Sequence, residues 1–213
     1  VARGGVAGVS NSTRGLCAGG NTPSTSNVID YVSLDSQGDY TDFGDLVGYT
    51  QYTSGNLNTP TRGIFFGTND PSSQNIIQYV TIASTGNATD FGDMTINRQF
   101  CGGVTSSTRG VMSGGNSSPS SPANVIDYIT MASTGNATDF GDHAILYNDS
   151  GICGLTDTTK GLFTGICAPS AGVRSTIIDY ITISTTGNTA DFGDLTVATN
   201  FAGGASSNHG GLA

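Results

Sequence analysis

A stretch of 17 residues recurs four times along this chain, and that repeat constrains the fold more than any other feature of the sequence. The copies occupy 29–45, 77–93, 126–142 and 178–194, and each ends in Asp-Phe-Gly-Asp (D-F-G-D). Their tyrosines are Tyr31, Tyr79, Tyr128 and Tyr180, so the repeat period is 48, 49 and then 52 residues. Tandem repeats of this length predict an array of similar units, each packed against its neighbours.

The composition favours strands and turns over helices. The 213 residues include 32 Gly, no Trp, a single Lys and no Glu. Glu and Lys are good helix formers on exposed surfaces, so their scarcity disfavours helices. Gly, Ser, Thr and Asn, together with Val, Ile, Tyr and Phe, suit short strands joined by tight turns. We therefore expect an all-β fold.

Each unit is expected to hold four short strands. In the first unit the candidate strands lie at 3–12, 13–21, 27–36 and 40–46, bounded by turn-forming residues. Short apolar runs between turn residues are typical of strands. The units cover about 1–46, 47–94, 95–143 and 144–195, and a partial fifth unit follows at 196–213. We expect a single repeat domain over 1–213.

Two connections within the unit differ in how constant they are. The connection before D-F-G-D keeps one length in all units and contains a glycine followed by Asp or Asn, at Gly38, Gly86, Gly135 and Gly187. Such a pair between strands is typical of a type II′ turn, so we expect a tight hairpin there. The loop between the second and third strands varies in length and content, at 22–26, 70–74, 117–123 and 168–175.

The third strand of each unit carries apolar side chains on both faces, as in 28–34 and 177–183. A strand of this kind is usually covered on both sides. Four-stranded sheets stacked face to face around an axis provide such cover, and this is the β-propeller arrangement. The period also suits a propeller blade of the kelch size.

Part of the unit resembles the kelch repeat. A strand ends in Gly-Gly at 18–21 and 113–116, and an aromatic residue follows in the next strand. The kelch pattern also has a Trp after the Tyr; this chain has none, and the Phe of D-F-G-D takes that place. The resemblance implies a kelch-like β-propeller of four-stranded blades, with four full units and a partial fifth.

The longer unit is similar to repeats in uncharacterised structural proteins of tailed bacteriophages, especially marine ones. The similarity rests on Thr-Arg-Gly followed by Gly-Gly-Asn, and on the segment that reads IDYITMASTGNATDFGD at 126–142. It extends over nearly the whole chain. It implies a virion-associated tail, fibre or capsid-decorating protein, and it supplies no catalytic residues.

A cation recurs once per unit at the start of the second strand, at Arg14, Arg62, Arg109 and Lys160. The carboxylates of the D-F-G-D copies recur with it, at Asp42, Asp45, Asp90, Asp93, Asp139, Asp142, Asp191 and Asp194. A guanidinium can hold a carboxylate with two hydrogen bonds. We therefore expect this cation to pair with an aspartate of the same or the adjacent blade and to lock the blades together.

The aromatic residues of the repeat are expected to be packing residues. They are the four tyrosines Tyr31, Tyr79, Tyr128 and Tyr180, and the four phenylalanines Phe43, Phe91, Phe140 and Phe192. A motif copied in every unit is more typical of a scaffold, because a single active site needs only one copy.

The sequence indicates no catalytic, cofactor-binding or metal site. The D-F-G of protein kinases occurs once and follows an H-R-D loop, which is missing here. The eight carboxylates could suit calcium, but the spacing of a calcium loop is absent. The cysteines Cys17, Cys101, Cys153 and Cys167 fall at four different positions of the repeat, so we expect free thiols.

The charge limits the partners. A formal net charge of −9 disfavours nucleic acid phosphates and anionic membranes, and no apolar run is long enough to span a bilayer. The leading hypothesis is a non-enzymatic structural or interaction protein in a virion or outside cells, with no cofactor. Its partners would be other virion proteins or copies of itself. The alternative is a carbohydrate-binding adhesin or lectin that binds cell-surface glycan through the variable loops.

Overall fold

The described residues of the chain form four antiparallel sheets, which we call blades one to four. The computed structural model describes residues 2–51, 54–69, 72–117, 121–147, 152–157, 159–165, 174–199, 202–204 and 206. All regular structure in this part of the chain is β, so the prediction of an all-β fold is confirmed. No helix in the described ranges could cross a membrane.

Each blade contains four strands that pair in chain order. Blade one holds β1 (Ala7–Ser10), β2 (Arg14–Ala18), β3 (Ser26–Ser33) and β4 (Thr41–Thr50); blade two holds β5 (Ser54–Asn58), β6 (Arg62–Asn69), β7 (Ser73–Thr81) and β8 (Thr89–Arg98). Blade three holds β9 (Gly102–Thr105), β10 (Arg109–Ser113), β12 (Ser121–Thr130) and β13 (Thr138–Tyr147), with the short β11 (Asn116–Ser117) beside β12. Blade four holds β14 (Cys153–Thr156), β15 (Lys160–Thr164), β16 (Ser175–Thr182) and β17 (Ala190–Thr199).

The outer strands are longer than the sequence predicted. We expected the units to end near 46, 94, 143 and 195, whereas the outer strands continue to Thr50, Arg98, Tyr147 and Thr199. The strands β4, β8 and β13 therefore carry the chain from one blade toward the start of the next.

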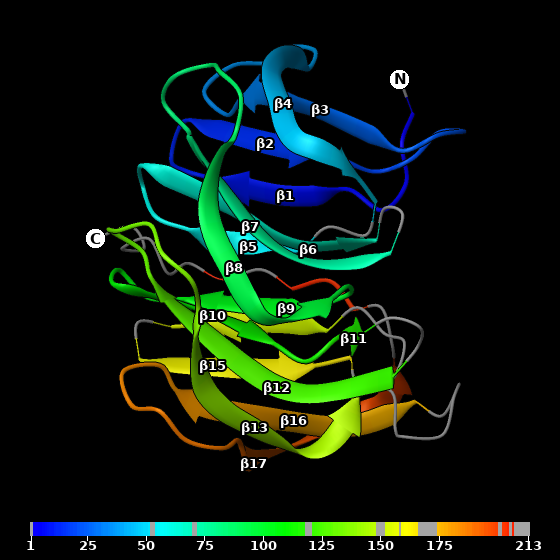
Figure 1. Cartoon of the computed structure of the whole chain (residues 1–213), viewed down its shortest axis with the longest axis vertical. Helices are drawn as coiled ribbons and strands as arrows, with labels where there is room; N and C mark the ends of the chain where they lie inside the picture. The colour runs from blue at the N-terminus through cyan, green and yellow to red at the C-terminus, as the bar shows by residue number, and fades with distance from the viewer. Residues whose placement is uncertain are drawn as a thin grey trace.

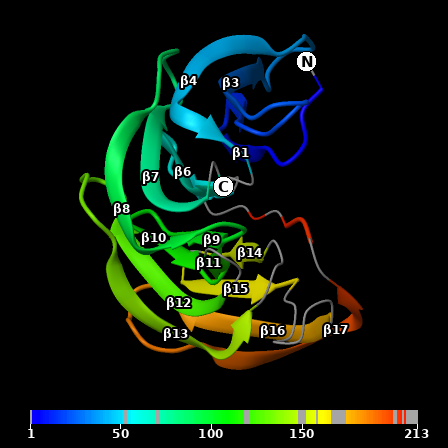
Figure 2. The same cartoon turned by 45° about the vertical axis from the view of Figure 1, so that its right-hand side comes forward.

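The blades stack in order along an arc (Figures 1 and 2). The inner strands form a row in which β1 packs on β5, β5 on β9, and β9 on β14. Figure 2 shows β4, β8 and β13 along one outer side of the arc, with blade one and blade four at its two ends. This is a propeller-like arrangement of four-stranded sheets.

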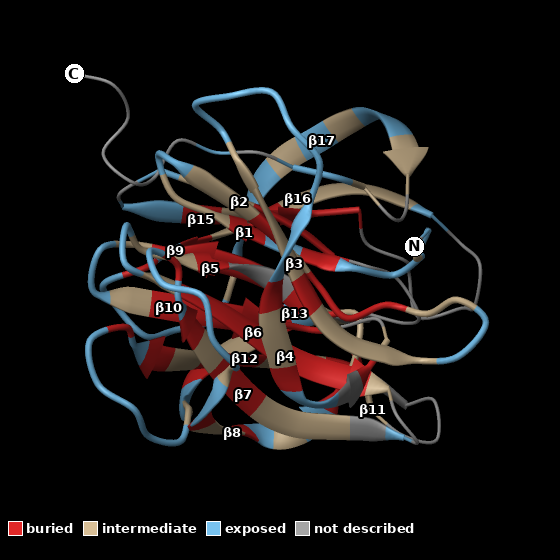
Figure 3. Ribbon diagram, turned by 90° about the horizontal axis from the view of Figure 1, so that it is seen from above, coloured by how far each residue is buried: buried red, intermediate tan, exposed pale blue. Residues whose placement is uncertain are grey.

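Three apolar cores lie between successive blades. Phe43 of blade one and Phe65 of blade two belong to the first core, and they are 2% and 0% exposed. Two similar cores join blade two to blade three and blade three to blade four. Figure 3 shows buried residues along the middle of the stack and exposed residues on the loops around it.

The expected tight hairpin before D-F-G-D is not present. In blade two β7 ends at Thr81 and β8 begins at Thr89, so seven residues connect the strands. The reason is tertiary: within this connection the N–H of Gly86 donates to the carbonyl of Phe43 in blade one. The constant loop length therefore fits a backbone that must reach the neighbouring blade, and a β-bulge between Ile77 and Gln78 adjusts the register behind it.

Candidate functional site

The junction between blades is where the repeated residues converge. At each junction two backbone N–H groups of the Thr-Gly-Asn loop donate to two carbonyl oxygens of D-F-G-D in the preceding blade. The first bond joins Gly86 to Phe43 (2.8 Å), Gly135 to Phe91 (2.7 Å) and Gly187 to Phe140 (2.7 Å). The second joins Ala88 to Asp45 (2.7 Å), Ala137 to Asp93 (2.8 Å) and Thr189 to Asp142 (3.0 Å). The loop thus extends the outer strand of its neighbour by backbone pairing.

The asparagine of the loop completes this contact. The side-chain oxygen of Asn87 accepts a hydrogen bond from the backbone N–H of Asp45 (3.0 Å). The same bond recurs from Asp93 to Asn136 (3.1 Å) and from Asp142 to Asn188 (3.0 Å). The Gly-Asn pair therefore serves blade docking.

The glycine of D-F-G-D allows the two backbones to meet. A Cβ at Gly44 would lie 2.5 Å from the carbonyl oxygen of Gly86. A Cβ at Gly92 or at Gly141 would be similarly close to the equivalent carbonyl oxygen of the next blade. Gly44 also has φ 145°, a conformation that L side chains rarely adopt. Any side chain at this position would push the blades apart.

The repeated cation occupies a different place from the one predicted. The guanidinium of Arg14 lies 4.8 Å from the centre of the Tyr31 ring in its own blade and donates to the carbonyl of Ile82 in the next blade (3.1 Å). Arg62 makes the same two contacts, with the ring of Tyr79 and the carbonyl of Met131. Arg109 makes them with the ring of Tyr128 and the carbonyl of Ile183. The ammonium group of Lys160 lies over the ring of Tyr180. The arginines therefore bridge adjacent blades through a ring and a carbonyl instead of through an aspartate.

The D-F-G-D carboxylates are not partners of these cations. In the part of the chain that the structure describes, ion pairs join Arg3 to Asp30 and Arg98 to Asp127, and the imidazole of His143 contacts the Asp179 carboxylate. The first D-F-G-D aspartates, Asp42, Asp90, Asp139 and Asp191, are exposed. In blade four Asp191 accepts from the N–H of Gly193 (3.1 Å) and Asp194 from the hydroxyl of Thr176 (2.7 Å).

The tyrosine and phenylalanine of each repeat pack edge to face. The ring centres are 5.9 Å apart for Tyr31 and Phe43, 5.9 Å for Tyr79 and Phe91, 6.0 Å for Tyr128 and Phe140, and 5.9 Å for Tyr180 and Phe192. Aromatic pairs favour this geometry. The first three phenylalanines are 2% exposed, whereas Phe192 at the end of the array is 51% exposed.

A second set of polar residues was missed in the sequence. The residue before each repeated tyrosine is Asp30, Gln78, Asp127 or Asp179, and each has a partner from outside its own strand pair. Gln78 accepts from the N–H of Val47 (2.7 Å). A polar residue in the middle of an apolar strand was the available signal, because a buried polar group needs a hydrogen-bonding partner.

Asp127 has the most complete set of partners. Arg98 donates to its carboxylate at 2.6 Å, and both side chains are 0% exposed. The backbone N–H and hydroxyl of Thr95 donate to the same carboxylate at 3.2 and 2.7 Å. Arg98 also donates to the carbonyls of Gly114 (2.9 Å) and Val125 (2.7 Å), so β8 of blade two is joined to blade three by a buried polar network.

His143 takes the corresponding role between blades three and four. Its Nδ1 lies 3.2 Å from a carboxylate oxygen of Asp179, and its Nε2 contacts the hydroxyl of Ser113. The side chain is 0% exposed, and burial lowers the pKa of His143 although the Asp179 carboxylate opposes that shift. The imidazole is therefore held neutral inside the blade junction.

The cysteines of the described residues are free thiols. Cys101 and Cys153 are buried, and burial raises the pKa of Cys101 to about 11. Cys17 is partly exposed and its Sγ lies 3.4 Å from the hydroxyl of Tyr40. The fourth cysteine, Cys167, lies outside the described residues. These thiols are placed for packing, and the described ranges contain no group of three or more His, Cys or Asp side chains that could hold a metal.

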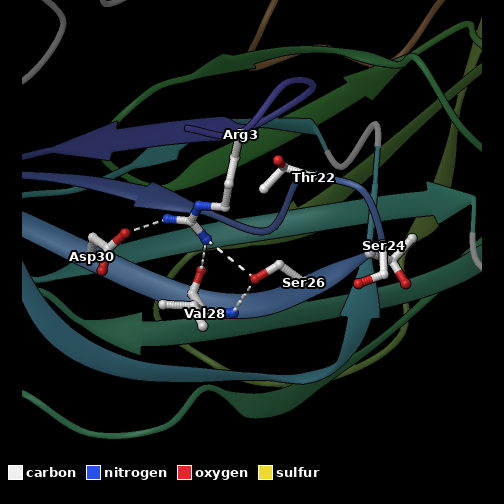
Figure 4. A pocket seen from close by; sticks show the side chains of 7 residues that line it. Arg3, Thr22, Ser24, Ser26, Val28 and Asp30 are labelled. Carbon is white, nitrogen blue, oxygen red and sulfur yellow. Dashed lines mark hydrogen bonds and ion pairs between the residues drawn. The ribbon is translucent and has the colours of Figure 1, made fainter. Parts of the chain in front are cut away.

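An open pocket of about 280 Å³ lies at the outer end of blade one (Figure 4). Arg3 lies at its centre and donates to the carbonyl of Val28 (2.8 Å), to the hydroxyl of Ser26 (3.4 Å) and to the carboxylate of Asp30. The variable loop adds Thr22, Ser24 and Thr25 to the lining. Most of the lining residues have polar side chains, and none of them is aromatic.

The variable loops of the other blades give less information. Much of 70–74, 117–123 and 168–175 lies outside the described residues. Only the loop at 22–26 can be placed in full, and it forms one wall of the Arg3 pocket.

Comparisons with known proteins bear on the fold alone. No family model and no curated protein sequence matches this chain. Among the solved structures, 210 chains match, and one of them is the structure of YjhT, with a TM-score of 0.73 and 8% sequence identity. That match covers 94% of this chain and 68% of the other. This chain therefore shares the propeller-like, four-stranded sheet architecture of YjhT.

Proposed function

We propose that this chain is a non-enzymatic structural protein: a kelch-like propeller array that belongs to a tailed-phage particle and acts there in assembly or surface presentation. One observation carries the proposal. The cation, the aromatic pair and the glycines that recur from blade to blade contribute to the packing of blades or to the junctions between them, as Arg109 does between Tyr128 and Ile183. Conserving a residue type from blade to blade is what a scaffold requires.

The phage assignment rests on the similarity of the repeat to phage structural proteins. It is supported by the acidic composition and by a repeated frame of blades that carries the variable loop at 22–26 in blade one. Its partners would be other virion proteins or further copies of the chain.

The test is to look for the protein in particles. Virions purified from a sample that encodes this chain should contain it in many copies by mass spectrometry, and antibodies against it should label one part of the particle by immunogold electron microscopy. Release into the supernatant, with none in intact particles, would contradict the virion assignment.

The lectin hypothesis stays as the alternative. Sugar sites commonly use aromatic rings to stack on the sugar, and the described pocket at Arg3 has none in its lining. A glycan array probed with the whole chain distinguishes the two functions. Binding that is lost in Thr22→Ala and Ser24→Ala variants would favour the lectin, whereas no binding would remove it.

A further inference from the structure

The outer face of blade one is built like the faces that are buried between blades. Leu34 is 55% exposed, although the residues at its position in the other blades, Ile82, Met131 and Ile183, are 0%, 2% and 1% exposed. Tyr40 is also 55% exposed. End repeats of an array need a polar outer face when that face meets water, and this one is apolar.

Cys17 and Tyr40 keep this face similar in volume to the others. At the position of Cys17 the other blades have the large residues Phe65, Met112 and Phe163, all 0% exposed. At the position of Tyr40 they have the small residues Ala88, Ala137 and Thr189. In blade one the small Cys17 and the large Tyr40 contact each other. The substitutions therefore compensate, as expected for a surface that packs against another blade.

The opposite end of the array is apolar too. Phe192 and Val197 of β17 are 51% and 72% exposed, while the phenylalanines of the other D-F-G-D copies are buried under the next blade. Blade four therefore presents an outer strand of the kind that blades one to three place on their neighbours.

The two ends match in one further detail. Thr95 of blade two donates two hydrogen bonds to the Asp127 carboxylate of the Arg98–Asp127 pair. The corresponding pair in blade one, Arg3 and Asp30, borders the open pocket, and their side chains are 9% and 29% exposed. The position of Thr95 is Val47 in β4 and Ala144 in β13, but in β17 it is again a threonine, Thr196. The residue that the Arg3 pocket lacks is thus present at the far end of the same chain.

We propose that the open face of blade one binds β17 of a second copy of this chain, head to tail. Thr196 of the second copy would donate to Asp30, as Thr95 does to Asp127. The loop at 38–40 would pair with the backbone of Phe192 and Asp194, as the loop of blade two pairs with β4. The same contact already occurs three times within the described chain, so the new contact would continue an existing interface.

This contact is heterologous, so each copy offers one donor face and one acceptor face. Two copies close into a ring if the rotation between them allows it, and otherwise they form a longer series. The inference deepens the proposed function, which it takes as its basis, by naming a second copy as the partner in assembly.

The segment after β17 competes with this contact. Gly204 lies against Cys153 and Leu155 of β14, in the place where the inner strand of a following blade packs. In the head-to-tail complex β1 of the second copy takes that place, so the segment must leave it. Removing the residues after Thr199 should therefore strengthen the association.

The experiment is sedimentation velocity of the purified chain and of a variant that ends at Thr199, over a wide range of protein concentration. We expect the 21.6 kDa chain to self-associate and the shortened variant to do so more tightly. Leu34→Asp should weaken the association about tenfold or more, because it removes a leucine that the contact would bury and adds an unpaired charge there. Ala132→Asp, which adds the same charge at an exposed site beside Met131, is the matched control.

Two further variants test the detailed contacts. Thr196→Val removes the hydroxyl meant for Asp30 while leaving an exposed strand position otherwise intact, and it should weaken association severalfold. Asp39→Asn gives blade one the Gly-Asn loop of the other blades and removes a negative charge that would face Asp194, so it should strengthen association. A shortened variant that stays monomeric at the highest concentration, or a dimer insensitive to both Leu34→Asp and Thr196→Val, would overturn the proposal. Because only purified chain is used, either result is independent of whether the protein is found in virions.

Discussion

Arg98 and Asp127 form an ion pair that is shielded from solvent, with 2.6 Å between a guanidinium nitrogen and a carboxylate oxygen and both side chains 0% exposed. The two residues come from different blades, since Arg98 ends β8 and Asp127 lies in β12. A buried charge is tolerated only when it is paired and hydrogen-bonded, so this pair links the fold of blade three to the position of blade two.

Replacing Arg98 with Met should lower the free energy of unfolding by about 3–5 kcal/mol, because it leaves the Asp127 carboxylate buried without its charged partner. Urea denaturation followed by circular dichroism measures the loss. The matched control is Arg3→Met, which breaks the equivalent but partly exposed pair with Asp30 and should cost only about 1 kcal/mol. Equal losses in the two variants would contradict a role for burial.

Replacing Asn136 with Ala should destabilise the array by about 1 kcal/mol, since it removes the acceptor of the Asp93 N–H between blades two and three. Asn136→Asp keeps an acceptor and should cost less. Asp39 holds the same position in blade one but docks on no other blade within the described residues, so in monomeric protein Asp39→Ala should leave the denaturation midpoint unchanged. A comparable loss from Asp39→Ala would mean that the effect comes from the loop itself and not from blade docking.

Replacing Arg109 with Ala should lower the free energy of unfolding by about 1–2 kcal/mol, because both the ring contact with Tyr128 and the hydrogen bond to Ile183 are lost. Asp139→Ala is the informative comparison. If the cation were held by D-F-G-D, the two variants would be equally damaging; the observed contacts predict a negligible effect for the exposed Asp139. Differential scanning calorimetry of both variants decides between the two arrangements.

Stability should fall as the pH drops below about 6.5, because of His143. Burial lowers the pKa of His143 in the folded chain, so below the ordinary value of 6.5 the unfolded chain binds more protons than the folded one. The contribution of the neutral ring is complete above that pH and is lost progressively on acidification toward the lowered pKa. The measurement is urea denaturation at a series of pH values.

His143→Gln provides the control for that prediction. A glutamine keeps hydrogen-bonding groups near Asp179 and Ser113 but does not titrate, so the variant should show a flatter dependence on pH between neutral and mildly acidic conditions. An unchanged pH profile in His143→Gln would assign the dependence to other groups.

Much of the architecture could be predicted from the repeat. The spacing from Tyr31 to Tyr79, the apolar third strand and the turn-rich composition together indicated stacked four-stranded sheets, and these features are local or recur at a fixed period. The edge-to-face pairing of Tyr31 with Phe43 lies within one blade, where strand pairing brings the two positions together. Such features are readable because they depend on residues near one another in the sequence.

The partners of the polar residues could not be predicted in this way. The charge pattern suggested that Arg14 would pair with an aspartate, but the neighbouring blade presents the carbonyl of Ile82, which is 68 residues away in the chain. Likewise, Gly86 and Asn87 have the sequence of a hairpin turn, and only the position of β4 makes them a docking loop. A short sequence motif does not specify which groups a separate sheet brings within hydrogen-bonding distance.

The sequence by itself therefore determined the all-β class and the four-stranded unit, because these follow from composition, alternation and period. Only the tertiary structure decided that Asp127 is paired and buried, that His143 is held neutral and that the array has two apolar ends. Each of these properties depends on what the adjacent blade covers, and burial by a neighbouring sheet is set by the packing of the whole array and not by the residues of one unit.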